Sequence, residues 1–235
     1  MICLSKTLDE IKILCENSPF GCPIVSAAEA YGLEQPFARF WTDGHAAYSM
    51  LDGVVRISGK ITDAEEVSAF LYAVGAEQVV CDLETAEVLG LHITDRGAVL
   101  YKDLPTSCAV PREEVSVRQV YDVLHECDMV GEFEPFYLDV SHRTRHKTAL
   151  CTAMYSESEM TAAAVSVFGA NCTLITAVGV RSAYRRRGLG SAVMRKTEEY
   201  LSGRVYLFRA ENENERFYSS LGYMPCGTWC AGTLK

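Results

Sequence analysis

The sequence of 235 residues lacks several features that mark specialised classes of protein. Proline is scarce, at 7 residues, while apolar residues make up 49% and charged residues 23%, which is the composition of a packed globular protein rather than a disordered one. Met1 to Asn17 contain five charged side chains, which argues against a signal peptide or a membrane span there. We therefore expect a cytoplasmic protein that does not act on a membrane.

Basic residues are also relatively few: 22 basic residues stand against 31 acidic ones, so the formal net charge is -9. A wide acidic field repels phosphates, and we therefore expect no nucleic-acid partner. A local basic site remains compatible with this charge. Binding through the arginines between 181 and 195 would have to appear as a strongly salt-dependent affinity for oligonucleotides.

Cysteine is plentiful, with 10 residues, but the paired spacing of a zinc site or a disulfide framework is missing. Most cysteines lie inside apolar runs, such as 79–81 and 150–151, which is typical of buried free thiols. Two short arrangements, His125-Glu126-Cys127 and Cys226 with Cys230, have no matching second half. We expect neither disulfides nor a metal site in a reducing compartment.

The N-terminal half alternates between helical and strand patterns. Thr7 with Glu10 forms a capping box ahead of an apolar helical face. Asp52-Gly53 then separates two apolar runs, 46–51 and 54–61, and predicts an antiparallel hairpin.

A second capping box and a boundary follow. Thr62 with Glu65 predicts a helix that ends at Gly75, and 79–81 is a short buried strand. The stretch from 104 to 111 contains two prolines and no helical stripe. We therefore divide the chain into an N-terminal domain, 1–110, and a C-terminal domain, 111–235.

The C-terminal half has clearer periodicity. Val117, Val120, Tyr121 and Leu124 share one helical face, and three later runs rich in Ala, Val, Thr and Ile are separated by turn residues. The expected elements are a helix near 117–124, a meander of strands 148–155, 161–168 and 173–180, a helix from 189 that Gly203 stops, a strand 204–210 and a helix 214–221.

The strongest signal is Arg185-Arg186-Arg187-Gly188-Leu189-Gly190, between a strand and a helix. Glycines allow a phosphate to approach the backbone, and a helix that begins near Leu189 presents unpaired N–H groups and a positive dipole to it. The arginines add charge-assisted contacts. The plain alternative is a glycine-containing turn with a solvated basic run.

This segment resembles the central motif of the GNAT superfamily, R/Q-x-x-G-x-G/A between the fourth strand and third helix. A second resemblance is the run from Asn214 to Tyr223, which has the family's order of Asn, aromatic, Tyr and a final Leu-Gly-Tyr. Ser182 stands where the family often has proline. The resemblance covers about 113 to 235 and implies an α+β fold, with a mostly antiparallel twisted sheet flanked by helices.

The resemblance also implies a cosubstrate, acetyl-CoA or a related short acyl-CoA. Backbone N–H groups from Arg186 to Ser191 would hold the pyrophosphate, and the backbone of 178–180 would pair with the pantetheine arm. An N–H near Val178 or Gly179 would polarise the acyl carbonyl. The implied binding residues are Val178, Gly179, Val180, Arg185, Arg186, Arg187, Gly188, Leu189, Gly190, Ser191, Asn214 and Phe217.

Tyr218 is the predicted catalytic residue, because the departing thiolate needs a proton and a phenol with a pKa of about 10 can supply it. The alternative is a tyrosine that only packs in its helix. Asn214 either contacts the pantetheine or caps its helix. The implied activity is N-acetylation of a small-molecule or peptide primary amine by direct attack; a CoA-binding module without turnover is the alternative.

The general base is not assigned, because no carboxylate lies within 173–180. His142, His146, Glu132, Glu134 and Asp139 lie before the second strand of the meander, where family members commonly line the acceptor pocket. The segment 141–147 is interpreted either as a solvated basic loop, which we favour, or as a catalytic cluster. A homodimer is left open.

The N-terminal half shows the same series of elements as the C-terminal half, which suggests a degenerate GNAT-like repeat. Aligning 89–91 with 221–223 puts Ala86 at the place of Tyr218 and Asp82 at that of Asn214. This half would then have lost its cofactor site and its acid, and would complete the sheet or wall the acceptor pocket. The competing interpretation is an unrelated α+β extension.

Overall fold

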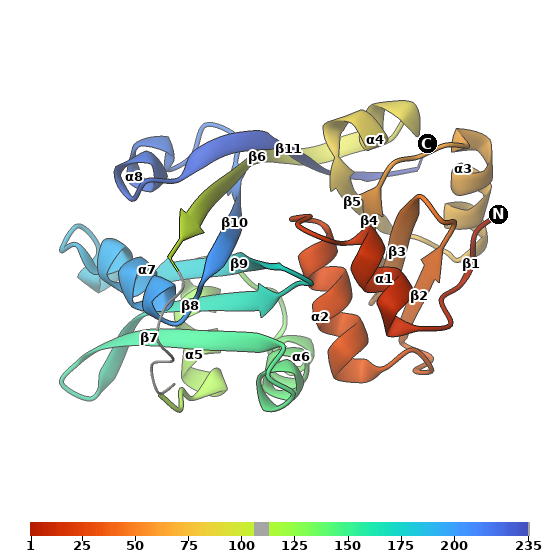
Figure 1. The fold of residues 1–235 in the computed structure, drawn as a ribbon. Coiled ribbons are helices and arrows are strands. Elements are labelled where there is room, and N and C mark those ends of the chain that lie inside the picture. Colours follow the sequence, from red (N-terminus) through yellow and green to blue (C-terminus); the bar gives the residue numbers. More distant parts are fainter. Residues whose placement is uncertain (106–112, 235) are drawn as a thin grey trace.

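A computed structural model describes residues 1–105 and 113–234, so most of the expected domain boundary lies outside the described residues. Within these ranges all strands join one sheet, in the order β1-β2-β3-β4-β5-β11-β6-β10-β9-β8-β7 (Figure 1). Neighbouring strands are antiparallel except for β4 with β5 and β9 with β10. The predicted mostly antiparallel sheet flanked by helices is confirmed, as a mixed sheet.

The N-terminal half contributes the first part of this sheet and the helices around it. Its elements are β1 (Cys3–Leu4), α1 (Leu8–Leu14), α2 (Gly21–Tyr31), β2 (Ala38–Thr42), β3 (Ala46–Leu51), β4 (Val54–Gly59), α3 (Ala64–Ala73), β5 (Gln78–Asp82), α4 (Leu83–Val88) and β6 (His92–Leu104). The hairpin at Asp52-Gly53 is present, with Leu51 opposite Val54.

The C-terminal half contains the meander and the helices expected from the motifs. Its elements are α5 (Val117–Glu126), α6 (Phe133–Arg145), β7 (Ala149–Ser156), β8 (Glu159–Phe168), β9 (Cys172–Val180), the 3-10 turn η1 (Ser182–Tyr184), α7 (Leu189–Glu199), β10 (Gly203–Ala210), α8 (Glu215–Ser220) and β11 (Met224–Thr233).

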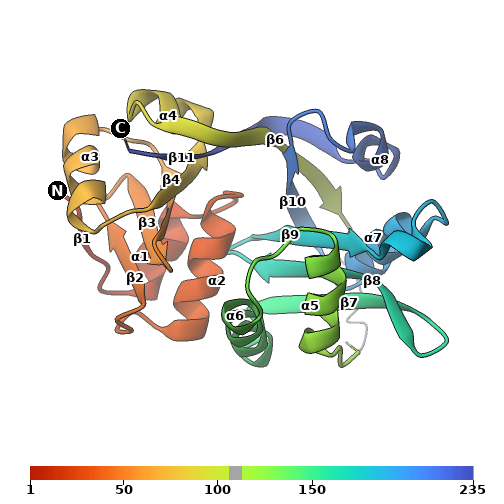
Figure 2. The same cartoon turned by 180° about the vertical axis from the view of Figure 1, so that it is seen from behind.

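The two halves share one order of elements. From α1 to β6 and from α5 to β11, two helices precede three antiparallel strands, and a helix, a parallel strand, a short helix and a long strand follow. The final strands are exchanged: β6 pairs with β10, and β6 and β11 pair with each other (Figure 2). On its other side β11 pairs with β5. Consequently the halves 1–110 and 111–235 are joined through the middle of the sheet.

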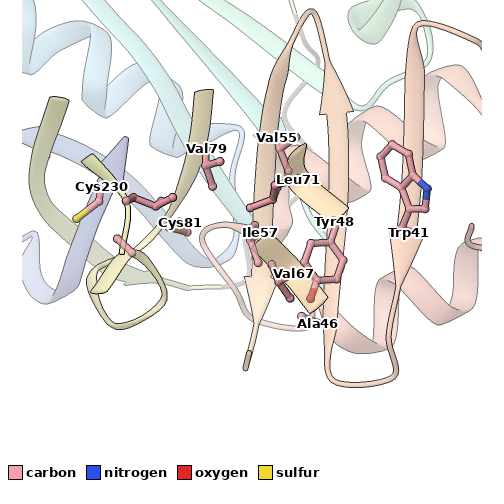
Figure 3. Packing of buried hydrophobic residues seen from close by; sticks show 12 residues of the cluster. Trp41, Ala46, Tyr48, Val55, Ile57, Val67, Leu71, Val79, Cys81 and Cys230 are labelled. Carbon is pink, nitrogen blue, oxygen red and sulfur yellow. The ribbon is translucent and has the colours of Figure 1, made fainter. Parts of the chain in front are cut away.

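The hydrophobic cores reflect this exchange. Val55, Ile57 and Leu71 pack in the N-terminal core together with Cys230, which comes from β11 (Figure 3). In the same way Leu100 of β6 packs in the core beneath α7. Each half therefore completes its core with a strand from the other.

Local expectations were wrong in three places. The cap of α3 is Asp63 rather than Thr62, because the Asp63 carboxylate accepts the Glu66 N–H at 2.9 Å. Helix α7 ends at Glu199, before the predicted stop at Gly203, which begins β10. Helix α2 was not expected. Gly21 and Pro23 lie in its first turn and interrupt the apolar spacing that would have predicted a helix.

The segment 141–147 is not a loop, because most of it forms the end of α6. Arg143 is buried there: its Nε donates to Asp139 Oδ1 at 2.7 Å and its Nη1 donates to Ser26 Oγ at 3.1 Å. A polar side chain of a helix can be buried where another helix supplies a hydrogen-bond partner. Here α2 supplies Ser26.

Candidate functional site

The site begins where β9 and β10 separate. These strands pair in parallel from Cys172–Arg204 to Ile175–Leu207, and no pair follows although β9 continues to Val180. On its other side β9 has a bulge at Thr176, because Ala177 lies opposite Val165 and Ile175 opposite Ser166. The backbone of 178–180 is thus released from β10.

The turn after β9 is held by Glu126, at the end of α5. Its carboxylate accepts the Ser182 N–H and the Ser182 hydroxyl, each at 2.8 Å, and Arg181 Nη1 at 2.7 Å. These donors, led by the Ser182 N–H, hold the pKa of the Glu126 carboxyl below its usual value. Glu126 therefore positions the turn that leads into α7.

The start of α7 is open to an anion. Gly188 occupies the N-cap with φ 78° and Arg186 has φ 61°, and no side chain caps the helix. Among the described residues, none accepts a hydrogen bond from the N–H groups of Arg186 to Ser191. Uncapped N–H groups together with the helix dipole favour bound negative charge.

Gly190 has a packing role that the motif alone did not indicate. A Cβ at this position would lie 3.3 Å from Cζ of Phe217, on α8. Glycine therefore lets α7 and α8 approach each other closely, and α8 carries Tyr218. Asn214 precedes α8 at the N-cap position with φ 52°, yet its side chain makes no capping hydrogen bond.

These elements enclose a cleft of about 610 Å³. Every predicted site residue lines it except Arg187, whose guanidinium lies 5.5 Å from the centre of the Tyr184 ring. The sequence reasoning missed four lining residues, Cys127, Met129, Tyr184 and Glu213. A larger hollow of about 900 Å³ beside α6 and β7 is lined by Ser141, Thr144, Arg145 and Lys147 of the segment 141–147. Neither Tyr218, nor a predicted cofactor-binding residue, nor a free N–H group lines it, so the smaller cleft is the better candidate.

Tyr218 lies on the cleft side of α8. Burial is the main cause that raises the pKa of its phenol above the usual value, while the charge of Arg209 opposes the shift. The phenol therefore keeps its proton at neutral pH. Its ring packs against Phe217, at 4.9 Å between centroids, so packing orients the group without removing it from the cleft.

Cys127 enters the cleft from the end of α5, although no cysteine lies between Val178 and Tyr218 in the sequence. Its Sγ donates to the Val180 carbonyl at 3.3 Å, and Arg185 Nε donates to the same oxygen at 3.1 Å. The last carbonyl of β9 is therefore already engaged. Only the fold of α5 against β9 could reveal this contact.

The polar residues of α6 lie elsewhere. His142 Nε2 lies 2.9 Å from the Ala30 carbonyl, its ring stacks on Tyr31, and the Tyr31 hydroxyl donates to Asp139 at 2.6 Å. These contacts join α6 to α2, so the solvated loop that we favoured for 141–147 is wrong, whereas the catalytic cluster stays a prediction. None of the five predicted side chains, His142, His146, Glu132, Glu134 and Asp139, lines the cleft.

Comparison with known proteins adds two findings. Residues 117–223 match the model of the acetyltransferase (GNAT) family. No curated protein sequence matches the chain.

In the described residues no helix is long and apolar enough to cross a membrane.

The solved structures similar to this chain cover both of its halves. A GCN5-related N-acetyltransferase from Kribbella flavida has 16% identity and a TM-score of 0.61 over 91% of this chain and 96% of its own. A GCN5-related N-acetyltransferase from Sphaerobacter thermophilus has 14% identity and a TM-score of 0.59 over 98% of this chain and 94% of its own. A tandem GNAT protein from the clavulanic acid biosynthesis pathway has 12% identity and a TM-score of 0.53 over 95% of this chain and 92% of its own. At these identities the similarity concerns the fold.

Proposed function

Because residues 117–223 match the model of the GNAT acetyltransferase family, we propose that the protein transfers an acetyl group from acetyl-CoA to a primary amine. One observation carries this proposal: a run of N–H groups without partners among the described residues opens into the cleft that Tyr218 lines. An anion site and a proton donor in one cleft are what acyl transfer from CoA requires.

The residues of the cleft fit a CoA molecule. The N–H groups of Arg186 to Ser191 would bind the pyrophosphate, and the exposed Arg185 and Arg186 side chains add positive charge. A Cβ at Gly188 would meet nothing within 4 Å, so space beside the turn is available. The pantetheine arm would lie along 178–180, where β9 has left β10.

Acetyl-CoA supplies a thioester whose acyl carbon a neutral amine can attack. An N–H of Val178 or Gly179 would stabilise the charge that develops on the carbonyl oxygen. Tyr218, protonated at neutral pH, would then donate its proton to the departing sulfur. Attack is direct: the Cys127 thiol donates to the Val180 carbonyl, its sulfur accepts from Arg185 Nη2 at 3.7 Å, and among the described residues no base contacts it.

The test combines binding with product detection. Titration calorimetry should show micromolar binding of acetyl-CoA, and incubation with a panel of amines should give free CoA and an N-acetylated amine in equal amounts. Both products are best detected by mass spectrometry, because the protein's own 10 cysteines would react with a thiol reagent. Absence of acetyl-CoA binding would overturn the proposal. Binding without transfer to any amine would favour a CoA-binding module.

A further inference from the structure

Arg56 lies at an unusual place for a charged side chain. Its neighbours on β4, Val55 and Ile57, point into the N-terminal core, so Arg56 points to the opposite face of the sheet. There it lines a cavity of about 190 Å³ between the two halves.

Besides Arg56, the residues that wall the cavity come from four elements, and all except Thr176 are apolar. They are Phe20 and Pro23 at the start of α2, Val80 on β5, Leu174, Ile175 and Thr176 on β9, and Phe208 on β10. Arg56 is the one charged residue in this lining. The start of α2 is packed firmly against β9, since Cys22 Sγ lies 3.0 Å from Cys172 Sγ.

The backbone of Arg56 pairs within the sheet, but its guanidinium makes no hydrogen bond, ion pair or ring contact with the described residues. The nearest charges are Arg143 and Asp139, which are bound to each other, and Asp52. Burial, and next the charge of Arg143, lower the pKa of Arg56 to about 10, so the guanidinium is still cationic at neutral pH. Arg56 is partly buried, so in this apolar lining the donors of its guanidinium have few partners, and a bound anion would satisfy them.

The position of the cavity links it to the acyl-CoA cleft. Ile175 and Leu207 form the last pair between β9 and β10, and the next residue on each strand, Thr176 and Phe208, lines the cavity. Val178, which lines the cleft, is only two residues beyond Thr176 along β9. The cavity therefore lies at the point where the strands separate.

We propose that this cavity binds the second substrate, and that this substrate is an α-amino acid, with its carboxylate on Arg56 and its amine directed towards the separation of β9 and β10. The inference rests on the proposed acyl transfer. A guanidinium binds a carboxylate through two parallel hydrogen bonds, which orients as well as holds the substrate. The apolar walls favour a small apolar side chain.

The reaction balances with the groups already named. The amine nitrogen forms a bond to the acyl carbon while the bond from that carbon to sulfur breaks. The sulfur takes the proton of Tyr218 and leaves as the CoA thiol, and the amine releases one proton that returns to the phenol through solvent. The products are an N-acetyl amino acid and CoA.

Direct binding tests the acceptor without depending on turnover. The twenty common L-amino acids are titrated into the protein with and without CoA, followed by the decarboxylated amine and the methyl ester of the best ligand. We expect the amino acid to bind at least about 10-fold more tightly than either analogue, and Arg56→Met to weaken it by about 10- to 100-fold. Arg56→Lys, which keeps the charge but loses the fork, should give an intermediate loss.

Arg39→Met is the matched control, because Arg39 is an exposed arginine on strand β2 of the same half and should leave binding unchanged. Acetyl-CoA is titrated into every variant, and an unchanged affinity shows that Arg56→Met is folded. Equal binding of the decarboxylated amine, an unaffected Arg56→Met, or no amino acid bound would overturn the inference. Amino-acid binding that depends on Arg56 without any acetyl-CoA binding would instead sustain the amino-acid site at Arg56 and overturn the proposed acyl transfer.

Discussion

Helices α3 and α7 occupy the same place in the two halves, each after the third strand of a meander, but their first turns differ. In α3 the Asp63 carboxylate caps the Glu66 N–H, and Glu65 and Glu66 add negative charge. In α7 Gly188 leaves the N–H groups uncapped, and the preceding turn is basic. The same backbone arrangement thus has a helix start capped by its own side chain in one half. In the other half it has a helix start that can bind an anion.

The short helices α4 and α8 differ in the same sense. Asp82 caps α4 and Ala86 is buried in the N-terminal core, whereas α8 places Tyr218 on the cleft. A hollow of about 280 Å³ lies beside α4, but two carboxylates, Asp82 and Glu84, line it against one cation, Lys60, and disfavour a phosphate. We propose that residues 1–110 are a degenerate GNAT-like repeat, which completes the sheet and walls the acceptor cavity through Arg56.

Transferring the acidic cap to the C-terminal half should have the largest effect. In Gly188→Asp a carboxylate would compete for the N–H groups of α7 and repel the pyrophosphate, so we expect acetyl-CoA affinity to fall at least about 100-fold. Gly90→Asp is the matched control, because Gly90 also has positive φ, 62°, and open space around its Cβ. Calorimetry that finds both variants equally affected, or neither, would remove the assigned anion site.

Loss of the phenol should slow chemistry without weakening binding. For Tyr218→Phe we expect kcat to fall by about 100-fold or more, in the range typical of general acid catalysis, with unchanged acetyl-CoA affinity. Tyr184→Phe serves as control, since Tyr184 also lines the cleft but donates to Glu159 at 2.7 Å. A Tyr218→Phe enzyme with full kcat would mean that this tyrosine only packs.

Loosening the turn should have a moderate effect. Glu126→Gln weakens the contacts to Arg181 and Ser182, and we expect acetyl-CoA affinity to fall by about 10-fold. Because the pKa of Glu126 is depressed in the folded state, its stabilising effect is present above the unfolded value near 4.5 and is lost as pH falls through the folded value. The difference in Tm between wild type and Glu126→Gln should therefore shrink on acidification; a constant difference would contradict this role.

The cap of α3 should matter for stability alone. Asp63→Ala removes the bond to the Glu66 N–H and should lower the free energy of unfolding by about 1 kcal/mol. Chemical denaturation measures this, and acetyl-CoA titration of the same variant should give the wild-type affinity. A changed affinity would show that the N-terminal helix start takes part in cofactor binding, against the comparison made here.

The smallest effect is expected for Cys127→Ala, which removes the thiol that bonds the Val180 carbonyl. With direct attack on acetyl-CoA, kcat should stay within about 3-fold of wild type, since one neutral hydrogen bond contributes little. Intact-mass measurement after mixing with acetyl-CoA should find no acetylated protein. A lost kcat together with an acetylated wild-type Cys127 would instead indicate a covalent route.

Local secondary structure could largely be predicted from the sequence. The Asp52-Gly53 hairpin, the strands of the meander and the start of α7 at Leu189 follow from turn residues and apolar spacing, which act over a few residues. The cleft residues could also be anticipated, because glycine beside a helix start and a basic turn are features of one short segment.

Only the tertiary structure decided the rest. The burial of Arg143 between α6 and α2, the exchange of β6 and β11, and the entry of Cys127 into the cleft depend on partners far away in the chain. Arg56 looks like any polar residue in a hairpin strand, and its isolation in an apolar cavity arises only when the two halves close around α2. Sequence spacing determines local conformation, whereas desolvation of a charge is set by everything that packs around it.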